Sequence, residues 1–333
     1  MDPEEAHDLA QRVLPACQGY LRSLGDLSAL YGSQPENLTT SLAGREVKNP
    51  IGLAAGFDKN GRLTDTIPSL GFGFAEIGSI TAVATGGNPR PRLFRLPADY
   101  ALINRLGLNG EGATRVAERL SRQDLSFPFG VNIAKSNIAG LTGDKAAEDI
   151  GFSFKAIADL PLAYVTINTS CPNTHEGALF HLEELELILS AAQAVNKRDL
   201  PIFLKLSPDS SEDFLASVVK LSWNYDIQGF ICGNTTTSRA DLQETDANVI
   251  TAIGNGGLSG LPLRPRSLTQ LKLVRQLAHH DQELIACGGI FSAEHVREAL
   301  AAGAKCVQLY TALVYLGPTA VLEMLTELSS GAR

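Results

Sequence analysis

Eight short apolar segments recur along this chain of 333 residues, and longer amphipathic segments lie between most of them. The apolar segments are 50–56, 74–80, 129–134, 164–170, 201–207, 229–234, 283–289 and 306–312. The amphipathic ones include 113–122, 146–158, 182–194, 212–223, 267–280 and 293–302. Apolar strands that alternate with helices indicate a parallel sheet covered on both faces, and eight repeats predict an α/β fold of the closed (β/α)8 TIM barrel type. An open doubly wound sheet is the alternative, which the count of eight disfavours.

Polar or glycine residues stand where most of these segments end. They are Lys59, Ser79, Asn132, Asn168, Cys171, Lys205, Asn234, Gly288, Gly289, Tyr310 and Thr311. The carboxyl ends of the strands of a barrel meet at one mouth, where active sites lie. A single such residue is typical of a loop cap, but their recurrence at almost every strand predicts a ligand site.

The barrel is expected to comprise residues 39–333, and residues 1–38 are expected to form a short N-terminal helical segment. Pro3 suits a first helical turn, and Glu4 and Glu5 suit its positive end. This helix should run to about Val13, because Gly19 and later glycines break the pattern. Two insertions, 85–107 and 236–266, follow strands and should fold over the mouth.

Composition excludes several classes of function. The net charge is −8 and no dense Lys/Arg cluster is present, so nucleic acid is not an expected partner. The five cysteines show neither zinc nor iron–sulfur spacing, so no metal site is predicted. Cys232, Cys287 and Cys306 are expected to be small core residues. No membrane span or signal peptide is found, and a reducing, cytoplasmic location is expected.

The last two strands predict a phosphate site. Gly288 and Gly289 lead into a helix that should begin near Ser292, and such helix N-termini bind phosphate. Residues 256–260 (GGLSG) could add backbone donors. No G-x-G-x-x-G follows the first strand, which favours a mononucleotide such as FMN over a dinucleotide.

Residues 168–174 (NTSCPNT) place a thiol between carboxamides at the end of an apolar strand. Asn side chains can both donate and accept hydrogen bonds to a flat polar ring. Cys171 is therefore the candidate general base, since a nearby lysine or helix N-terminus can lower the pKa of a thiol. Lys205 could stabilise the N1/O2 edge of a reduced flavin, and Lys59 faces the same mouth.

Several motifs together resemble those of the dihydroorotate dehydrogenases, in the class 2 branch that passes electrons to quinone. They are 2–7 (DPEEAH), 49–59 (NPIGLAAGFDK), 71–79 (GFGFAEIGS), 87–92 (GNPRPR), 103–107 (INRLG), 130–132 (GVN), 168–174, 234–236 (NTT), 256–260 and 307–312 (VQLYTA). The resemblance covers nearly the whole chain.

The resemblance implies an FMN flavoprotein that oxidises dihydroorotate to orotate in de novo pyrimidine (UMP) biosynthesis. It implies that FMN is held by Ala55, Gly56, Ser79, Asn132, Asn168, Lys205, Gly260, Gly289, Tyr310 and Thr311. It implies that substrate is held by Lys59, Asn104, Asn168, Asn173, Asn234 and Thr235, with Cys171 as base and Lys59 as carboxylate partner. It also implies that His7 and Arg95 line a quinone entrance.

Three departures from the class 2 pattern stand out. Cys171 replaces the usual serine, as in class 1; the chain begins at the second helix of the usual N-terminal pair; and Gly233 replaces a usual threonine, with residues 175–178 (HEGA) also divergent. They keep open an FMN ene-reductase acting on another unsaturated or dihydropyrimidine-like substrate, a non-catalytic flavin sensor, and fumarate in place of quinone as acceptor. Membrane contact is expected to be at most peripheral, on the inner face. No oligomeric state is predicted.

Overall fold

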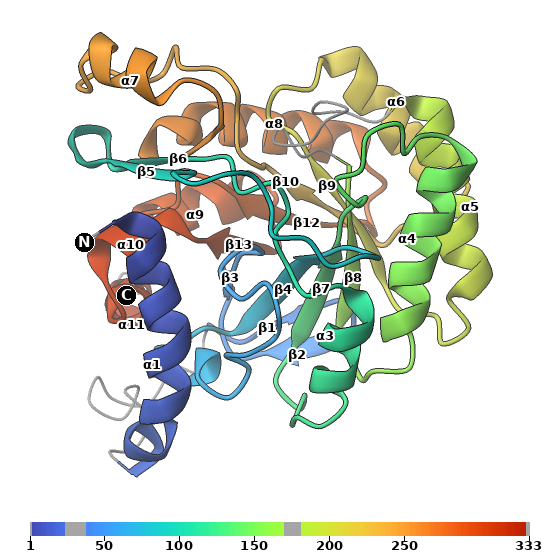
Figure 1. The fold of residues 1–333 in the computed structure, drawn as a ribbon, viewed down its shortest axis with the longest axis horizontal. Helices are drawn as coiled ribbons and strands as arrows, with labels where there is room; N and C mark the ends of the chain where they lie inside the picture. Colours follow the sequence, from blue (N-terminus) through green and yellow to red (C-terminus); the bar gives the residue numbers. More distant parts are fainter. Residues whose placement is uncertain (1, 24–37, 170–180, 331–333) are drawn as a thin grey trace.

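Eight parallel strands close into a barrel in the computed structural model, which describes residues 2–23, 38–169 and 181–330 (Figure 1). They are β3 (Ile51–Leu53), β4 (Phe74–Ile80), β7 (Phe129–Ile133), β8 (Tyr164–Asn168), β9 (Ile202–Leu206), β10 (Gly229–Cys232), β12 (Glu283–Cys287) and β13 (Cys306–Leu309). They follow one another around the barrel in chain order, and β13 pairs with β3. The predicted barrel is confirmed, and the doubly wound alternative is wrong.

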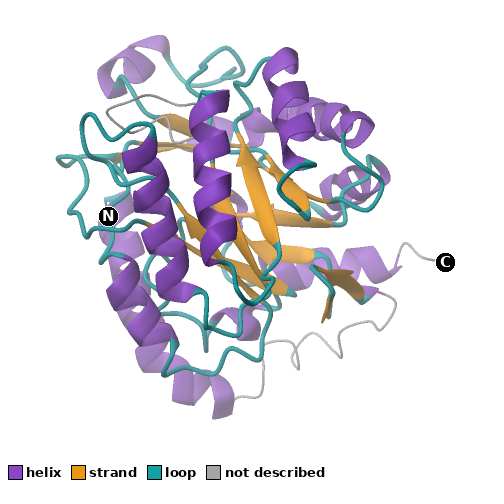
Figure 2. Ribbon diagram, turned by 90° about the vertical axis from the view of Figure 1, so that its right-hand side faces the viewer, coloured by secondary structure: helices purple, strands orange, loops and turns teal. Residues whose placement is uncertain are grey.

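Helices cover the outer face of the barrel (Figure 2). They are α3 (Ala113–Leu120), α4 (Asp144–Ile157), α5 (Leu182–Val195), α6 (Glu212–Ser222), α8 (Arg264–Leu277), α9 (Ala293–Ala301), α10 (Thr311–Leu316) and α11 (Ala320–Ser330), with the 3-10 turn η2 (Ile67–Leu70). The main apolar core lies between strands and helices. Ser211 and Ser292 cap α6 and α9 by accepting backbone N–H bonds. Helix α8 begins three residues before the predicted 267, because Pro265 fits a first turn.

Inside the barrel, side chains stack in layers because alternate residues of a strand point inward. The bottom layer is apolar and includes Phe74, Tyr164, Phe203, Ile285 and Cys306. The hairpin of β1 (Thr40–Leu42) and β2 (Arg45–Val47) packs Leu42 and Val47 against this layer. Two residues further along the strands, the inward positions become polar. This second, polar layer forms the floor of a site.

The two insertions meet over the mouth, as predicted. One supplies β5 (Leu93–Leu96), η3 (Pro97–Asp99) and β6 (Ala101–Asn104), and the other supplies α7 (Ala247–Ile253), β11 (Gly257–Gly260) and η4 (Leu261–Leu263). Strand β6 pairs with both β5 and β11 in an antiparallel sheet. The Asp99 carboxylate accepts backbone N–H bonds from Gln243, Glu244 and Thr245, which tie the insertions together.

Helix α1 (Pro3–Ser23) is longer than predicted: it does not end near Val13, and its backbone continues through Gly19. A helical glycine costs only about 1 kcal/mol, and tertiary packing supplies most helix stability. Leu14, beyond the predicted end, packs against the main core. Glu4 anchors the start of α1, because both of its oxygens accept bonds from the buried Arg92 guanidinium.

Candidate active site

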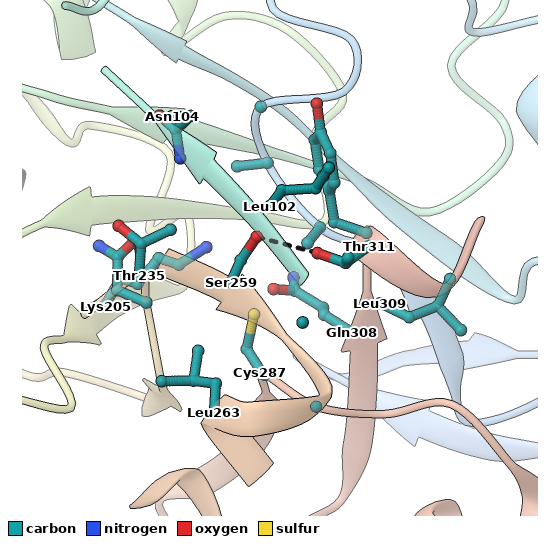
Figure 3. A pocket seen from close by; sticks show the side chains of 18 of the residues that line it. Leu102, Asn104, Lys205, Thr235, Ser259, Leu263, Cys287, Gln308, Leu309 and Thr311 are labelled. Atoms are coloured by element: carbon teal, nitrogen blue, oxygen red, sulfur yellow. Dashed lines mark hydrogen bonds between the residues drawn. The ribbon is translucent and has the colours of Figure 1, made fainter. Parts of the chain in front are cut away.

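A cavity opens at the carboxyl ends of the barrel strands, beneath the insertion sheet (Figure 3). Thirteen of the residues predicted to bind cofactor or substrate line it: Ala55, Gly56, Lys59, Ser79, Asn104, Asn168, Lys205, Asn234, Thr235, Gly260, Gly289, Tyr310 and Thr311. Asn132 does not line it but lies fully buried behind Ser79, whose hydroxyl donates to Asn132 Oδ1 at 2.5 Å. The structure therefore brings together groups that are far apart in the sequence.

The end of β8 is held in place by the neighbouring strand β9 and by the residue pair that follows β10. Asn234 Nδ2 donates to Asn168 Oδ1 at 3.2 Å, and the Asn234 side chain also accepts from the Thr235 N–H at 2.9 Å. Thr169 Oγ1 donates to the Lys205 carbonyl at 2.7 Å. Cys171 and Asn173, the next two predicted residues, lie outside the described residues. The strand that leads to them is thus fixed at the cavity.

Lys59 and Asn104 line the cavity from two different parts of the fold. Lys59 Nζ donates to Asn109 Oδ1 at 2.5 Å, and Asn104 Nδ2 donates to the Gly257 carbonyl at 3.3 Å. Lys59 follows β3, whereas Asn104 ends β6 of the insertion sheet. A cation and a carboxamide placed this way can bind a carboxylate and a ring amide.

Three glycines form one end of the cavity lining. Gly260, Gly288 and Gly289 have φ values of 112°, 117° and 71°. A Cβ at Gly289 would lie 2.6 Å from Arg264 Cα, so a side chain there would strain the backbone and collide with it. Ser259 Oγ and Thr311 Oγ1 lie 2.9 Å apart at the same end. Hydroxyls and approachable backbone N–H groups fit a phosphate.

Gly233 follows β10 with a φ of 123°, and a Cβ there would lie 1.7 Å from the Cys287 carbonyl oxygen. Gly233→Ala should therefore lower the free energy of unfolding by about 1–3 kcal/mol or more, the cost of a strained backbone plus a collision. Gly44→Ala is the matched control, since its φ is 73° but nothing lies within 4 Å. Urea unfolding of both variants makes the comparison, and equal losses would contradict the collision.

A second, apolar cavity lies under α1. Its walls include Ala6, Leu9, Ala10, Val13 and Leu14 of α1 together with Leu313, Val314 and Pro318 near the C-terminus, and His7 and Arg95 also line it. Leu93, Leu102 and Tyr310 line both cavities, which therefore adjoin. Burial raises the pKa of Tyr310 to about 12, so the shared wall stays uncharged.

His7 presents an uncharged ring to this second cavity. Burial lowers the pKa of the His7 ring, because the charged form loses its hydration. Its Nε2 donates to the Phe57 carbonyl at 2.9 Å, and its ring meets Phe57 edge-on. A neutral ring in an apolar cavity suits an uncharged planar ligand.

Three site residues were missed by sequence reasoning: Glu76, Gln308 and Cys287. Glu76 is a lone carboxylate within the apolar strand β4, two residues after the inward-facing Phe74, and that spacing was an available signal. Cys232 and Cys306 are buried in the core as predicted, whereas Cys287 lines the first cavity. Cys287 also packs against the apolar bottom layer, so its predicted core role is confirmed in part; it reaches the cavity because its strand ends at the cavity floor.

Among the helices of the described residues, none has both the length and the apolar character needed to cross a bilayer.

The barrel and its polar mouth define an α/β-barrel enzyme with a ligand cavity at the carboxyl ends of its strands. Residues 37–331 match the family model described as dihydroorotate dehydrogenase. The chain belongs to the dihydroorotate dehydrogenase family.

Relatives and solved structures agree with this assignment. The protein named dihydroorotate dehydrogenase (quinone) from Gloeobacter violaceus is 39% identical to this chain, and the alignment covers 99% of this chain and 91% of the relative. The protein of the same name from Thermosynechococcus vestitus is 40% identical, and the alignment covers 99% of this chain and 93% of the relative. The ligand-free dihydroorotate dehydrogenase structure from Eimeria tenella is 28% identical, with a TM-score of 0.81, covering 98% of this chain and 94% of that one.

Proposed function

We propose that this protein oxidises dihydroorotate to orotate with FMN as its bound cofactor, and that a quinone takes the electrons. The observation that carries the proposal is the convergence of thirteen predicted ligand residues on one cavity, in a chain whose relatives bear this activity in their names. FMN bound in this cavity would supply the hydride acceptor for substrate C6.

The residues present fit a flavin mononucleotide. The glycine-lined end, with Ser259 and Thr311, offers donors for a phosphate. At the floor, Lys205 supplies a cation, and the buried Gln308 Oε1 has no hydrogen-bond partner among the described residues. A flavin ring has both an acceptor edge and an N–H donor that can meet these two groups. Ser79 Oγ, with Asn132 behind it, supports the same floor.

Substrate would lie between this floor and the insertion sheet. Lys59 would pair with its carboxylate, and Asn104, Asn168, Asn173, Asn234 and Thr235 would hold the ring edges. Cys171 would take the proton from C5. The Asn234–Asn168 hydrogen bond supports this arrangement, since it orients two of the carboxamides toward one another at the cavity.

The cavity under α1 would admit the quinone, with His7 and Arg95 at its entrance. We propose that residues 1–38 form an N-terminal segment distinct from the barrel of residues 39–333. Helix α1 belongs to this segment and forms one wall of the cavity. We further propose a cytoplasmic protein in peripheral contact with the inner face of the membrane, where a lipid-soluble acceptor is available.

Acceptor use tests the quinone assignment. With dihydroorotate as donor, turnover with a short-chain quinone should exceed turnover with fumarate, because the apolar second cavity suits an uncharged planar molecule and disfavours a dianion. Steady-state rates with each acceptor at saturating dihydroorotate make the comparison. Faster turnover with fumarate would overturn the quinone assignment and leave the dihydroorotate half-reaction standing.

A further inference from the structure

A carboxylate lies at the centre of the barrel, directly below the cavity floor. Glu76, on β4, is 1% exposed. Its Oε1 accepts from Asn132 Nδ2 at 2.8 Å. Its Oε2 accepts from Thr166 Oγ1 and Gln308 Nε2, each at 3.0 Å, and from the Tyr164 hydroxyl at 3.2 Å. Four other strands (β7, β8, β9 and β13) thus direct polar groups at one buried side chain, counting the Lys205 ammonium of β9.

The network surrounds the Glu76 carboxylate with donors and one cation. A buried carboxylate persists as an anion only where donors and a cation compensate for its lost hydration. Four donors do so here, and Lys205 Nζ lies 4.0 Å from Oε1. Burial and the Glu76 charge raise the pKa of Tyr164 well above its usual range, so its hydroxyl remains a donor.

Glu76 fixes the orientation of the Gln308 amide. An ionised carboxylate can only accept hydrogen bonds, so it must face the amide nitrogen of Gln308. The amide oxygen Oε1 then lies on the other side of the group, buried and without a partner in the described part of the chain. Gln308 lines the cavity together with Lys205 (Figure 3). The floor therefore offers a bound ring one acceptor and one cation.

Glu76 also controls how much of the Lys205 charge a ligand experiences. Both side chains are almost fully buried, and Coulomb interactions are strong where water is excluded. Their charges reach the cavity lining: burial raises the pKa of the Cys287 thiol, Lys205 opposes that rise and Glu76 adds to it. The carboxylate thus offsets part of the positive charge at the floor.

We propose that Glu76 is a positioning residue that orients Gln308, holds Lys205 on the cavity floor and lowers the reduction potential of the bound flavin. The proposal rests on the proposed function, because it requires the flavin to lie on this floor. A cation near the ring favours the reduced, anionic flavin. A carboxylate behind that cation weakens the effect and keeps the potential low enough to pass electrons onward.

Two substitutions should shift the flavin midpoint potential in opposite directions. Glu76→Gln keeps the shape of the side chain but removes its negative charge, so the midpoint potential should rise. The equilibrium constant for flavin reduction should change tenfold or more, which is about 30 mV or more for a two-electron couple. Tyr164→Phe keeps the carboxylate but removes one donor, so more of its negative charge acts on Lys205 and the potential should fall. Tyr225→Phe is the matched control, because its hydroxyl contacts Ser190 on the outer helices.

The measurement is equilibration of each flavin-loaded protein with reference dyes of known potential. A higher potential in Glu76→Gln and a lower potential in Tyr164→Phe, with no shift in Tyr225→Phe, support the proposal. Any other combination of shifts overturns it and leaves Glu76 a structural group. Should Glu76→Gln fail to fold, a fall in Tyr164→Phe still supports the proposal and any other result there overturns it. Failure of the wild type to bind flavin or to be reduced by dihydroorotate would instead refute the proposed function.

Discussion

Flavin reduction by dihydroorotate should slow by roughly 10²–10⁴-fold when Cys171 is replaced by alanine, the usual contribution of a positioned general base. Cys171 lies outside the described residues, but β8 leads to it, and Asn168 at the end of β8 lines the cavity. Stopped-flow mixing without oxygen isolates this half-reaction. The dissociation constant of orotate should change far less than the rate of flavin reduction, since the thiol is expected to take a proton rather than to bind the ligand.

Cys306→Ala is the matched control, because this thiol is buried in the apolar bottom layer, away from the cavity. It should leave the rate of flavin reduction unchanged. Cys171→Ser should restore part of the rate and move the rising limb of the pH profile upward, because a hydroxyl is a weaker acid than a thiol. An alanine variant as fast as the wild type would remove Cys171 from the mechanism.

Ala10→Trp should strongly raise the KM for quinone while leaving flavin reduction by dihydroorotate intact. Ala10 lines the cavity under α1 and does not line the first cavity. Overpacking an apolar site costs about 1–3 kcal/mol, which corresponds to roughly a 5- to 140-fold loss of quinone affinity. The KM for a short-chain quinone and the separate reductive half-reaction measure the two effects.

Glu5→Trp adds the same ring to an exposed residue of α1 that lines none of the described cavities near the helix. It should leave the quinone KM close to the wild-type value. If both variants impair quinone reduction equally, the effect comes from a general disturbance of α1. The second cavity would then lose its proposed role.

The sequence predicted the barrel well because its strands are buried on both faces and therefore appear as continuous apolar runs. Strand-end residues such as Lys59, Lys205 and Asn234 could be found for the same reason, since a barrel brings every strand end to one mouth. The residues that line the mouth could thus be predicted from their positions at the ends of the apolar segments.

Other features depend on contacts that order along the chain does not specify. Glu76 was missed because its role comes from donors on three other strands and a lysine on a fourth. The length of α1 was underestimated because packing of its apolar face, including Leu14, outweighs the local effect of Gly19. The second cavity needs α1, β5 and α10 together, and these elements are widely separated in sequence.

Mixing the purified, flavin-loaded protein with dihydroorotate in the absence of oxygen shows whether it oxidises this substrate. We expect the flavin absorbance band to bleach and orotate to form in equal amount. A band that keeps its full intensity at saturating dihydroorotate would contradict the proposed function.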